Sequence, residues 1–211
     1  MVRQQLKDVY FALTRHLSLV NHVSVRHRYR QASKAEGLYL HLGCGVTYIP
    51  GMINIDGNVR RKTDAWLDLR NGLPFPTESA FFIYTCHTIE HLYPDEAIRL
   101  IREMHRVLKN GHLARVAVPS MEHAMMIAAG SAQSEWPRRF SDSLGQAINY
   151  LFCDGQHKYG YSYGSIAELA LSAGFSDVSH YSRENGVTPK RYGKVLVGDE
   201  PAGSLVVELV K

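Results

Sequence analysis

Hydrophobic and polar residues follow two patterns along the chain, and each pattern predicts one kind of secondary structure. In residues 6–20, apolar side chains recur at every third or fourth position, which predicts an amphipathic helix with one packing face. The basic residues 26–30 predict a solvated linker, with contact to an anionic ligand or a membrane surface as the alternative. We therefore expect a helix and basic linker in residues 1–30 and one domain in residues 31–211. The apolar positions of the helix are Leu6, Val9, Tyr10, Leu13, Leu17 and Val20.

Short apolar segments bounded by glycine, proline and polar residues predict the strands of a sheet. A helix is predicted from Pro94 to the pair Asn110-Gly111, because proline favours a first helical turn and glycine a helix end. Further helices are predicted within residues 120–160 and at 165–174, and a polar loop between the last two strands. Strands alternating with helices indicate an α/β fold with a mostly parallel sheet. Strands are predicted at residues 38–42, 52–55, 65–67, 80–86, 113–119, 177–181 and 204–210.

Composition limits the classes of protein that fit. The 211 residues suit one domain, and 24 basic against 20 acidic residues give a net charge of +4, spread along the chain rather than clustered as in many nucleic-acid binders. The three cysteines show no CxxC spacing, so neither a disulfide framework nor a thiolate zinc site is predicted, and a reducing cytoplasm fits best. No segment reaches the roughly 20 apolar residues that span a bilayer, so we expect no transmembrane segment.

The first predicted strand runs into a glycine loop, Leu42-Gly43-Cys44-Gly45. Glycine lets the backbone approach a ligand closely, and a ligand is expected at the carboxyl edge of such a sheet, although a tight turn alone also explains the two glycines. A dinucleotide site requires a third glycine, where this chain has Tyr48, and an acid about 20 residues after the first glycine. The acid here, Asp56, follows Gly43 by 13 residues (56 − 43), so an NAD enzyme is disfavoured.

Two acids follow the glycine loop at the ends of the second and third predicted strands. Asp56 is placed to accept hydrogen bonds from vicinal ribose hydroxyls, and Asp68 is suited to accept one from an adenine amine. The alternative is that both are ordinary exposed acids of turns.

A series of motifs in this order resembles the class I S-adenosylmethionine (SAM) dependent methyltransferases. The similarity covers roughly residues 36–180, and it is strongest to small bacterial methyltransferases often encoded among cell-surface polysaccharide genes. It implies a Rossmann-like fold with an antiparallel C-terminal strand and SAM as cofactor. The motifs are Leu40-His-Leu-Gly-Cys-Gly, Asn54-Ile-Asp, Leu67-Asp-Leu-Arg, Leu73-Pro-Phe-Pro, Ile89-Glu-His-Leu, Glu103-Met-His-Arg-Val-Leu-Lys and Ala173-Gly-Phe.

The resemblance assigns roles at the matching positions. The loop from Leu42 through Gly43 and Cys44 to Gly45 would pass beneath the methionine part of SAM. Asp56 would hold the ribose, and Asp68 with the backbone of Leu69 would hold the adenine. The end of the next strand, at Cys86, would face the sulfonium and the acceptor.

The chain departs from the family at two informative places. His41 stands where most relatives have an acid, which weakens the expected contact to the amino group of SAM. Only eight residues, 46–53, separate Gly45 from Asn54, whereas a helical crossover between parallel strands needs about a dozen. We therefore expect the first helix after the glycine loop to be shortened or absent, and the N-terminal helix to cover the sheet face left open.

The activity expected is methylation of a small-molecule or sugar acceptor, at oxygen. A hydroxyl acceptor calls for a base, for which His87 and His157 are the candidates, with Tyr159 beside the acceptor. Residues 84–88 lack the Asp/Asn-Pro-Pro-aromatic tetrapeptide of many DNA-modifying relatives, so DNA base methylation is not expected. Glu90 and His91 are expected to fix their loop.

Two other functions stay open. The chain could bind SAM or a partner without catalysis, given His41 and the missing helix. The segment His87-x-x-Glu90-His91 also matches the pattern of inverted zinc peptidases, which requires both histidines on one sustained helix. Because Pro94 follows closely, the methyltransferase interpretation is preferred and no metal ligand is assigned.

Overall fold

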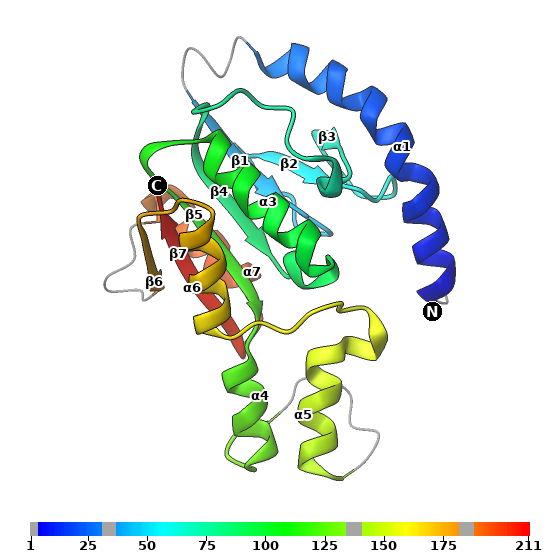
Figure 1. The fold of residues 1–211 in the computed structure, drawn as a ribbon, viewed down its shortest axis with the longest axis vertical. Helices are drawn as coiled ribbons and strands as arrows, with labels where there is room; N and C mark the ends of the chain where they lie inside the picture. Colours follow the sequence, from blue (N-terminus) through cyan, green and yellow to red (C-terminus); the bar gives the residue numbers. More distant parts are fainter. Residues whose placement is uncertain (1–3, 31–36, 134–140, 182–187) are drawn as a thin grey trace.

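A computed structural model describes residues 4–30, 37–133, 141–181 and 188–211, in which seven strands form one sheet with helices on both faces (Figure 1). The strand order is β3-β2-β1-β4-β5-β7-β6, and β7 runs antiparallel to both of its neighbours while the other pairs are parallel. The predicted α/β fold with an antiparallel C-terminal strand is confirmed. The strands are β1 (Leu38–Leu42), β2 (Ile53–Asp56), β3 (Ala65–Trp66), β4 (Ala80–Cys86), β5 (Leu108–Pro119), β6 (Asp177–His180) and β7 (Ser204–Val210).

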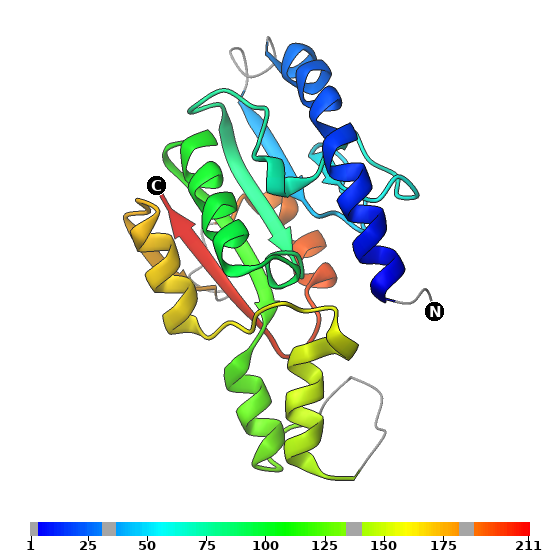
Figure 2. The ribbon, with the colours of Figure 1, turned by 45° about the vertical axis from the view of Figure 1, so that its right-hand side comes forward.

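The helices divide between the two faces of the sheet. α3 and α6 lie in front of it in Figure 1, and α7 lies behind. α4 and α5 form a helical hairpin beyond the carboxyl end of β5, at the bottom of Figures 1 and 2. None of the helices in the described residues is both long and apolar enough to cross a membrane. The helices are α1 (Gln4–Tyr29), α3 (Pro94–Val107), α4 (Met121–Ala128), α5 (Ser143–Phe152), α6 (Tyr163–Ser172) and α7 (Lys190–Asp199), with short 3-10 turns η1 (Leu69–Asn71), η2 (Ile89–His91) and η3 (Cys153–Gly155).

The chain between β1 and β2 contains no helix, as its length predicted. The sheet face left open is covered by α7, whose Tyr192 and Leu196 are buried in a cluster with Ile49, Met52 and Phe82. The sequence predicted a polar loop in this segment, and that prediction is wrong. Its cause is the composition of α7, where few apolar positions stand among glycines and charged residues, so its periodicity is weak.

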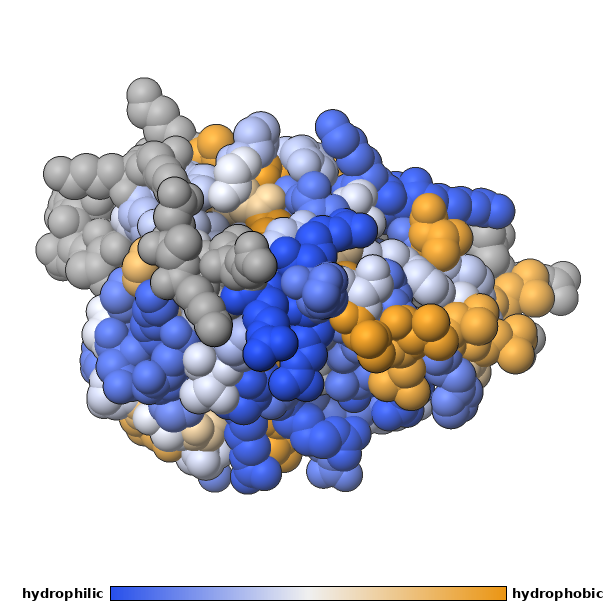
Figure 3. Space-filling view, turned by 90° about the horizontal axis from the view of Figure 1, so that it is seen from above, coloured by the Kyte–Doolittle hydropathy of each residue, from blue (hydrophilic) through white to orange (hydrophobic). Residues whose placement is uncertain are grey.

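α1 is longer than predicted and is oriented differently. It extends to Tyr29, so the basic run forms its last turn rather than a linker. Its contacts are with β3 and η1, and Val25 joins the core on the α3 side of the sheet, so α1 does not cover the open face. The predicted packing stripe faces outward instead, with Leu13 68% and Val20 76% exposed, and Figure 3 shows it as a hydrophobic band. Periodicity identifies an apolar stripe but not its partner.

The junction of α3 and β5 also differs from the prediction. α3 ends at Val107 and β5 begins at once at Leu108, so Gly111 lies inside the strand and not at a helix end. Its φ of 73° falls where the pairing with β4 shifts, from Ala80 opposite Leu108 to Phe82 opposite Leu113. A glycine in the left-handed region can end a helix, but here it accommodates an irregularity within a strand.

Candidate active site

The strand register brings the predicted cofactor residues to one edge of the sheet. Leu42 pairs with Ile55 of β2 and with Thr85 of β4, so the residues that follow each of them leave the sheet together. β1 also lies where the strand order reverses, which is the point at which open α/β sheets bind ligands. Gly43, Asp56 and Cys86 therefore meet at the carboxyl edge.

The two glycines of the loop serve different purposes. Gly43 has a φ of 67°, and a Cβ there would lie 2.1 Å from the hydroxyl of Thr88, so this glycine lets the segment after β4 approach the loop. Gly45 has a φ of 53°, but a Cβ there would meet nothing closer than 4.0 Å. Leu42 and Cys44 are buried, and burial raises the pKa of the Cys44 thiol to about 12, so they offer backbone rather than side chains. The open side of the loop is at Gly45.

Asp56 is held in place from two sides. One carboxylate oxygen accepts a hydrogen bond from the amide of Gly45 at 2.8 Å, and the other accepts one from the amide of Asn58 at 2.7 Å. A carboxylate has about four acceptor sites, so capacity for further donors is left. Two rigid backbone donors thus orient an acid that fits the ribose hydroxyls of a nucleoside.

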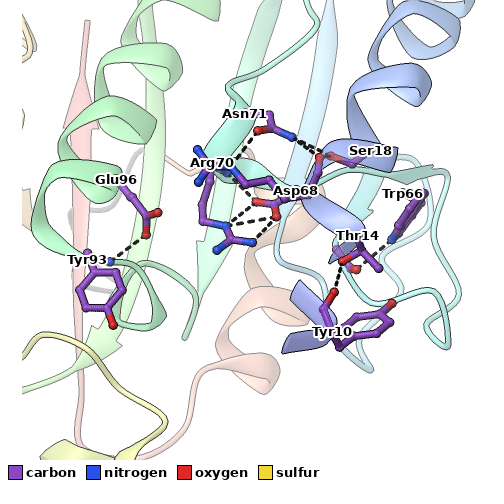
Figure 4. Close-up of polar contacts among 11 residues, drawn as sticks. Tyr10, Thr14, Ser18, Trp66, Asp68, Arg70, Asn71, Tyr93 and Glu96 are labelled. Carbon is purple, nitrogen blue, oxygen red and sulfur yellow. Dashed lines mark hydrogen bonds and ion pairs between the residues drawn. The ribbon is translucent and has the colours of Figure 1, made fainter. Parts of the chain in front are cut away.

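Asp68 is engaged more fully. The guanidinium of Arg70 binds both of its carboxylate oxygens, with the closest contact at 2.6 Å, and the amide of Arg70 donates to it at 3.0 Å (Figure 4). The neighbouring Asn71 points to Ser18 and fastens η1 to α1. Leu69 is buried beside this pair. An adenine amine therefore reaches the carboxylate of Asp68 only by sharing it with Arg70.

Asp199, at the C-terminus of α7, is a site residue that sequence reasoning missed. Its carboxylate accepts hydrogen bonds from the hydroxyl of Thr47 at 2.6 Å and from that of Tyr84 at 3.1 Å. Cys86 donates through its thiol to the Asp199 carbonyl at 3.8 Å. An acid thus lies between the glycine loop and the end of β4. No sequence signal could have placed it there, because 152 residues separate it from Thr47.

His41, which stands where most relatives have an acid, has a structural role in the interior. Its ring is buried, with Nδ1 3.1 Å from the amide oxygen of Asn54. Burial is the main reason that its pKa is lowered, so it is a neutral group in the interior. The carboxylate of Asp199 lies near enough to this ring to oppose the lowering of its pKa.

His87 and His157, the two predicted bases, lie on either side of Glu90. The Nδ1 atom of His87 is 3.6 Å, and the Nε2 atom of His157 is 3.9 Å, from the same carboxylate oxygen. Burial lowers the pKa of both histidines to about 4 and raises that of Glu90 to about 8. His87 has a φ of 47° and its Nε2 atom is 2.8 Å from the hydroxyl of Ser204. A non-glycine residue in this conformation is typical of functional sites.

The remaining predicted residues flank this group. His91 lies 3.1 Å through Nδ1 from the carbonyl of Gln156, so it joins its loop to a segment 65 residues further along the chain instead of making a local hydrogen bond. Tyr159 donates its amide to the carbonyl of Glu90 at 3.3 Å, and its side chain is exposed. Residues 87–91 form a loop with the single turn η2, so the sustained helix that a zinc peptidase pattern requires is not formed.

Comparison with known proteins agrees with this geometry. Residues 37–115 match the sequence model of a methyltransferase domain. No curated protein shows significant similarity to the chain.

Solved structures share the fold. A SAM-dependent methyltransferase from Archaeoglobus fulgidus is 13% identical with a TM-score of 0.51, over 96% of this chain and 100% of that chain. A SAM-dependent methyltransferase from Thermotoga maritima, described as a possible histamine N-methyltransferase, is 17% identical with a TM-score of 0.54, over 99% and 96%. A chain in the complex of the Haloferax volcanii Trm112 methyltransferase activator and the putative methyltransferase is 14% identical with a TM-score of 0.52, over 90% of this chain and 92% of that chain.

The protein therefore has a methyltransferase fold, and the matched domain contains the glycine loop, both acids and β4. The solved structures that share this fold are described as SAM-dependent methyltransferases.

Proposed function

We propose that this protein is a SAM-dependent methyltransferase that transfers the methyl group of SAM to a hydroxyl oxygen of a small-molecule or sugar acceptor, with His87 as the proton acceptor. The observation that carries the proposal is the position of His87, which directly follows β4 beside the glycine loop in a left-handed conformation. Its side chain is 28% exposed, against 7% for His157, so an acceptor reaches His87 more readily. The resemblance to enzymes of polysaccharide genes supports a sugar acceptor and a cytoplasmic site of action.

We assign the cofactor contacts to the residues gathered at the carboxyl edge. Residues 42–45 would carry the methionine part, with the open side of Gly45 toward the ligand. Asp56 would hold the ribose, and Asp68 with Leu69 would hold the adenine while Arg70 keeps part of its contact. Cys86 would lie near the sulfonium.

Asp199 is our candidate for binding the amino group of SAM. Its carboxylate lies against Thr47 and Tyr84, close to the place where the family's usual acid is replaced by His41. A carboxylate and an ammonium form a charge-assisted hydrogen bond, which neither neutral His41 nor a backbone amide can supply.

SAM supplies an electrophilic methyl group on a sulfonium, so the protein has mainly to position the acceptor and take up its proton. Burial keeps His87 neutral over the ordinary pH range, so its ring is available as an acceptor. General base catalysis of this kind contributes about 10²–10⁴-fold to the rate. His157 and Tyr159 would support the acceptor side without taking its proton.

The test separates binding from catalysis. SAM affinity is measured by calorimetry, and methyl transfer is measured with labelled SAM against a panel of sugars and small alcohols. We expect His87→Gln to lower kcat about 10²-fold or more while the Kd for SAM is unchanged, and His112→Gln, at a partly exposed position in the first half of β5, to change neither. Full turnover by His87→Gln would remove the base assignment, and SAM binding without transfer to any acceptor would favour a protein that binds SAM without catalysis.

Asp199→Asn tests the amino-group contact. It keeps the size of the side chain and removes the charge, so SAM affinity should fall about tenfold, the effect of one charge-assisted hydrogen bond. A SAM analogue that lacks the amino group should bind the variant and the native enzyme equally. An equal loss for both ligands would show that Asp199 acts only through the fold.

A further inference from the structure

Three side chains beside the proposed acceptor position form a group with the composition of a metal site. Glu90 and His91 belong to η2, and His157 follows η3, so two separate loops contribute. One donor atom from each lies within 4.8 Å of the others. Two histidines and one carboxylate are the protein ligands of several catalytic zinc sites, which keep a fourth position open.

Both histidines are oriented as metal ligands usually are. His157 is bound through Nδ1 to the carbonyl of Leu151 at 2.6 Å, and His91 through Nδ1 to the carbonyl of Gln156 at 3.1 Å. A ring that donates from Nδ1 to a carbonyl carries its lone pair on Nε2. Metal-binding histidines are commonly held by such a second hydrogen bond, which fixes the tautomer and the ring. In His157, the Nε2 atom is the one that faces Glu90.

The carboxylate of Glu90 gives an independent indication. Its side chain is 1% exposed, and neither of its oxygens has a hydrogen-bond partner within the described part of the chain. An isolated buried carboxylate is strongly unfavourable, and in proteins it is paired, protonated or bound to a metal. The ring nitrogens that face it, on His87 and His157, are 3.6 and 3.9 Å away, too far for hydrogen bonds.

From these three observations we propose that Glu90, His91 and His157 bind a divalent transition cation such as Zn²⁺. Zinc bonds of about 2.0–2.2 Å separate neighbouring ligand atoms by roughly 3.4 Å. The 3.9 Å between Glu90 and His157 would therefore close by roughly 0.5 Å, and no pair of ligand atoms by more than roughly 1.4 Å. Imidazole and carboxylate together favour zinc over magnesium or calcium, which prefer oxygen ligands. This site differs from the peptidase pattern, because Glu90 is a ligand and His157 comes from another loop.

The metal's role rests on the proposed function, although its binding does not. His87 lies 3.6 Å from Glu90, so a cation at this site would be next to the proposed base. It would hold the acceptor hydroxyl and lower its pKa. The proton would pass to His87, the methyl group would move from sulfur to the acceptor oxygen, and S-adenosylhomocysteine would leave.

The experiment starts from protein stripped of metal with a chelator. Zn²⁺ is titrated by calorimetry, and Co²⁺ is added as a spectroscopic probe whose visible absorption reports its ligands. We expect one Zn²⁺ per chain, an increase in Tm on zinc addition, and binding weakened at least tenfold in Glu90→Gln and in His157→Gln. His112→Gln, which removes a partly exposed histidine elsewhere, should bind like the native chain. Glu90→Gln replaces a buried carboxyl whose oxygens have no hydrogen-bond partner in the described residues, so without metal the variant should be at least as stable as the native protein.

The outcomes are distinct from those of the proposed function, because SAM is titrated into the same metal-free samples. Failure to bind SAM would contradict the proposed function and leave the metal site standing. Absence of stoichiometric zinc, or equal zinc binding by the native chain and Glu90→Gln, would overturn the metal site. Loss of binding in His112→Gln would show that zinc binds at surface histidines and would also overturn it.

Discussion

Breaking the ion pair between Arg115 and Glu200 should destabilise the protein strongly. Arg115 lies in the middle of β5 with no exposed surface, and Glu200 directly follows α7. The guanidinium binds both carboxylate oxygens, at 2.6 and 2.5 Å, donates to the hydroxyl of Thr188 at 3.1 Å and lies 3.4 Å from the centre of the Tyr181 ring. The pair therefore joins the sheet to the helix that carries Asp199.

The expected magnitude follows from burial. Removing one member of a buried ion pair leaves the other charge uncompensated, which costs about 3–5 kcal/mol. Arg115→Met leaves Glu200, whose side chain is 7% exposed, without its partner, and Glu200→Gln leaves the guanidinium. The double variant removes both charges, so its loss of unfolding free energy should be smaller than the sum of the two single losses.

Urea unfolding of the four proteins measures this directly. Glu78→Gln serves as a control, because Glu78 is 48% exposed and its nearest contact with Lys211 is 3.7 Å, and it should change stability by less than about 1 kcal/mol. Single losses below about 1 kcal/mol, or a double loss equal to the sum, would refute the view that this pair is a coupled buried contact.

Three other predictions follow from contacts already described. Gly43→Ala should destabilise by more than about 2 kcal/mol, because its Cβ collides with a hydroxyl, whereas Gly45→Ala adds only the left-handed strain of about 1–2 kcal/mol; the reverse order in urea unfolding would contradict this. Leu196→Ala should lower the free energy of unfolding by about 2–5 kcal/mol, because this residue of α7 is buried. Val195→Ala, at an exposed position of the same helix, should change it by less than about 0.5 kcal/mol. Equal effects would mean that α7 does not cover the sheet. Burial acts to raise the pKa of Asp64, but three hydrogen bonds that its carboxylate accepts outweigh burial and lower the pKa. The carboxylate therefore stabilises the fold above the unfolded pKa of about 3.9, and this contribution is lost as the pH falls through the folded pKa. Asp64→Asn should therefore flatten acid unfolding, and an unchanged acid limb would argue against it.

Local sequence patterns determined much of the glycine loop and of the strand ends beside it. The apolar run at β4 and the glycines after β1 specify strands and a turn from neighbouring residues alone. The spacing of Asp56 from Gly43 disfavoured an NAD site, and the eight residues before Asn54 excluded a full helix. These inferences concern residues close in sequence, where spacing limits geometry directly.

Tertiary structure decided the contacts that bring distant segments together. The apolar stripe of α1 was visible in sequence, but whether it faces the core depends on the surface offered by β3 and η1. The cover of the open sheet face came from α7, and with it Asp199 reached the glycine loop. Glu90 and His157 also meet across loops far apart in the chain. The sequence shows how polar each position is, but whether a residue is buried or paired depends on which distant segment packs against it.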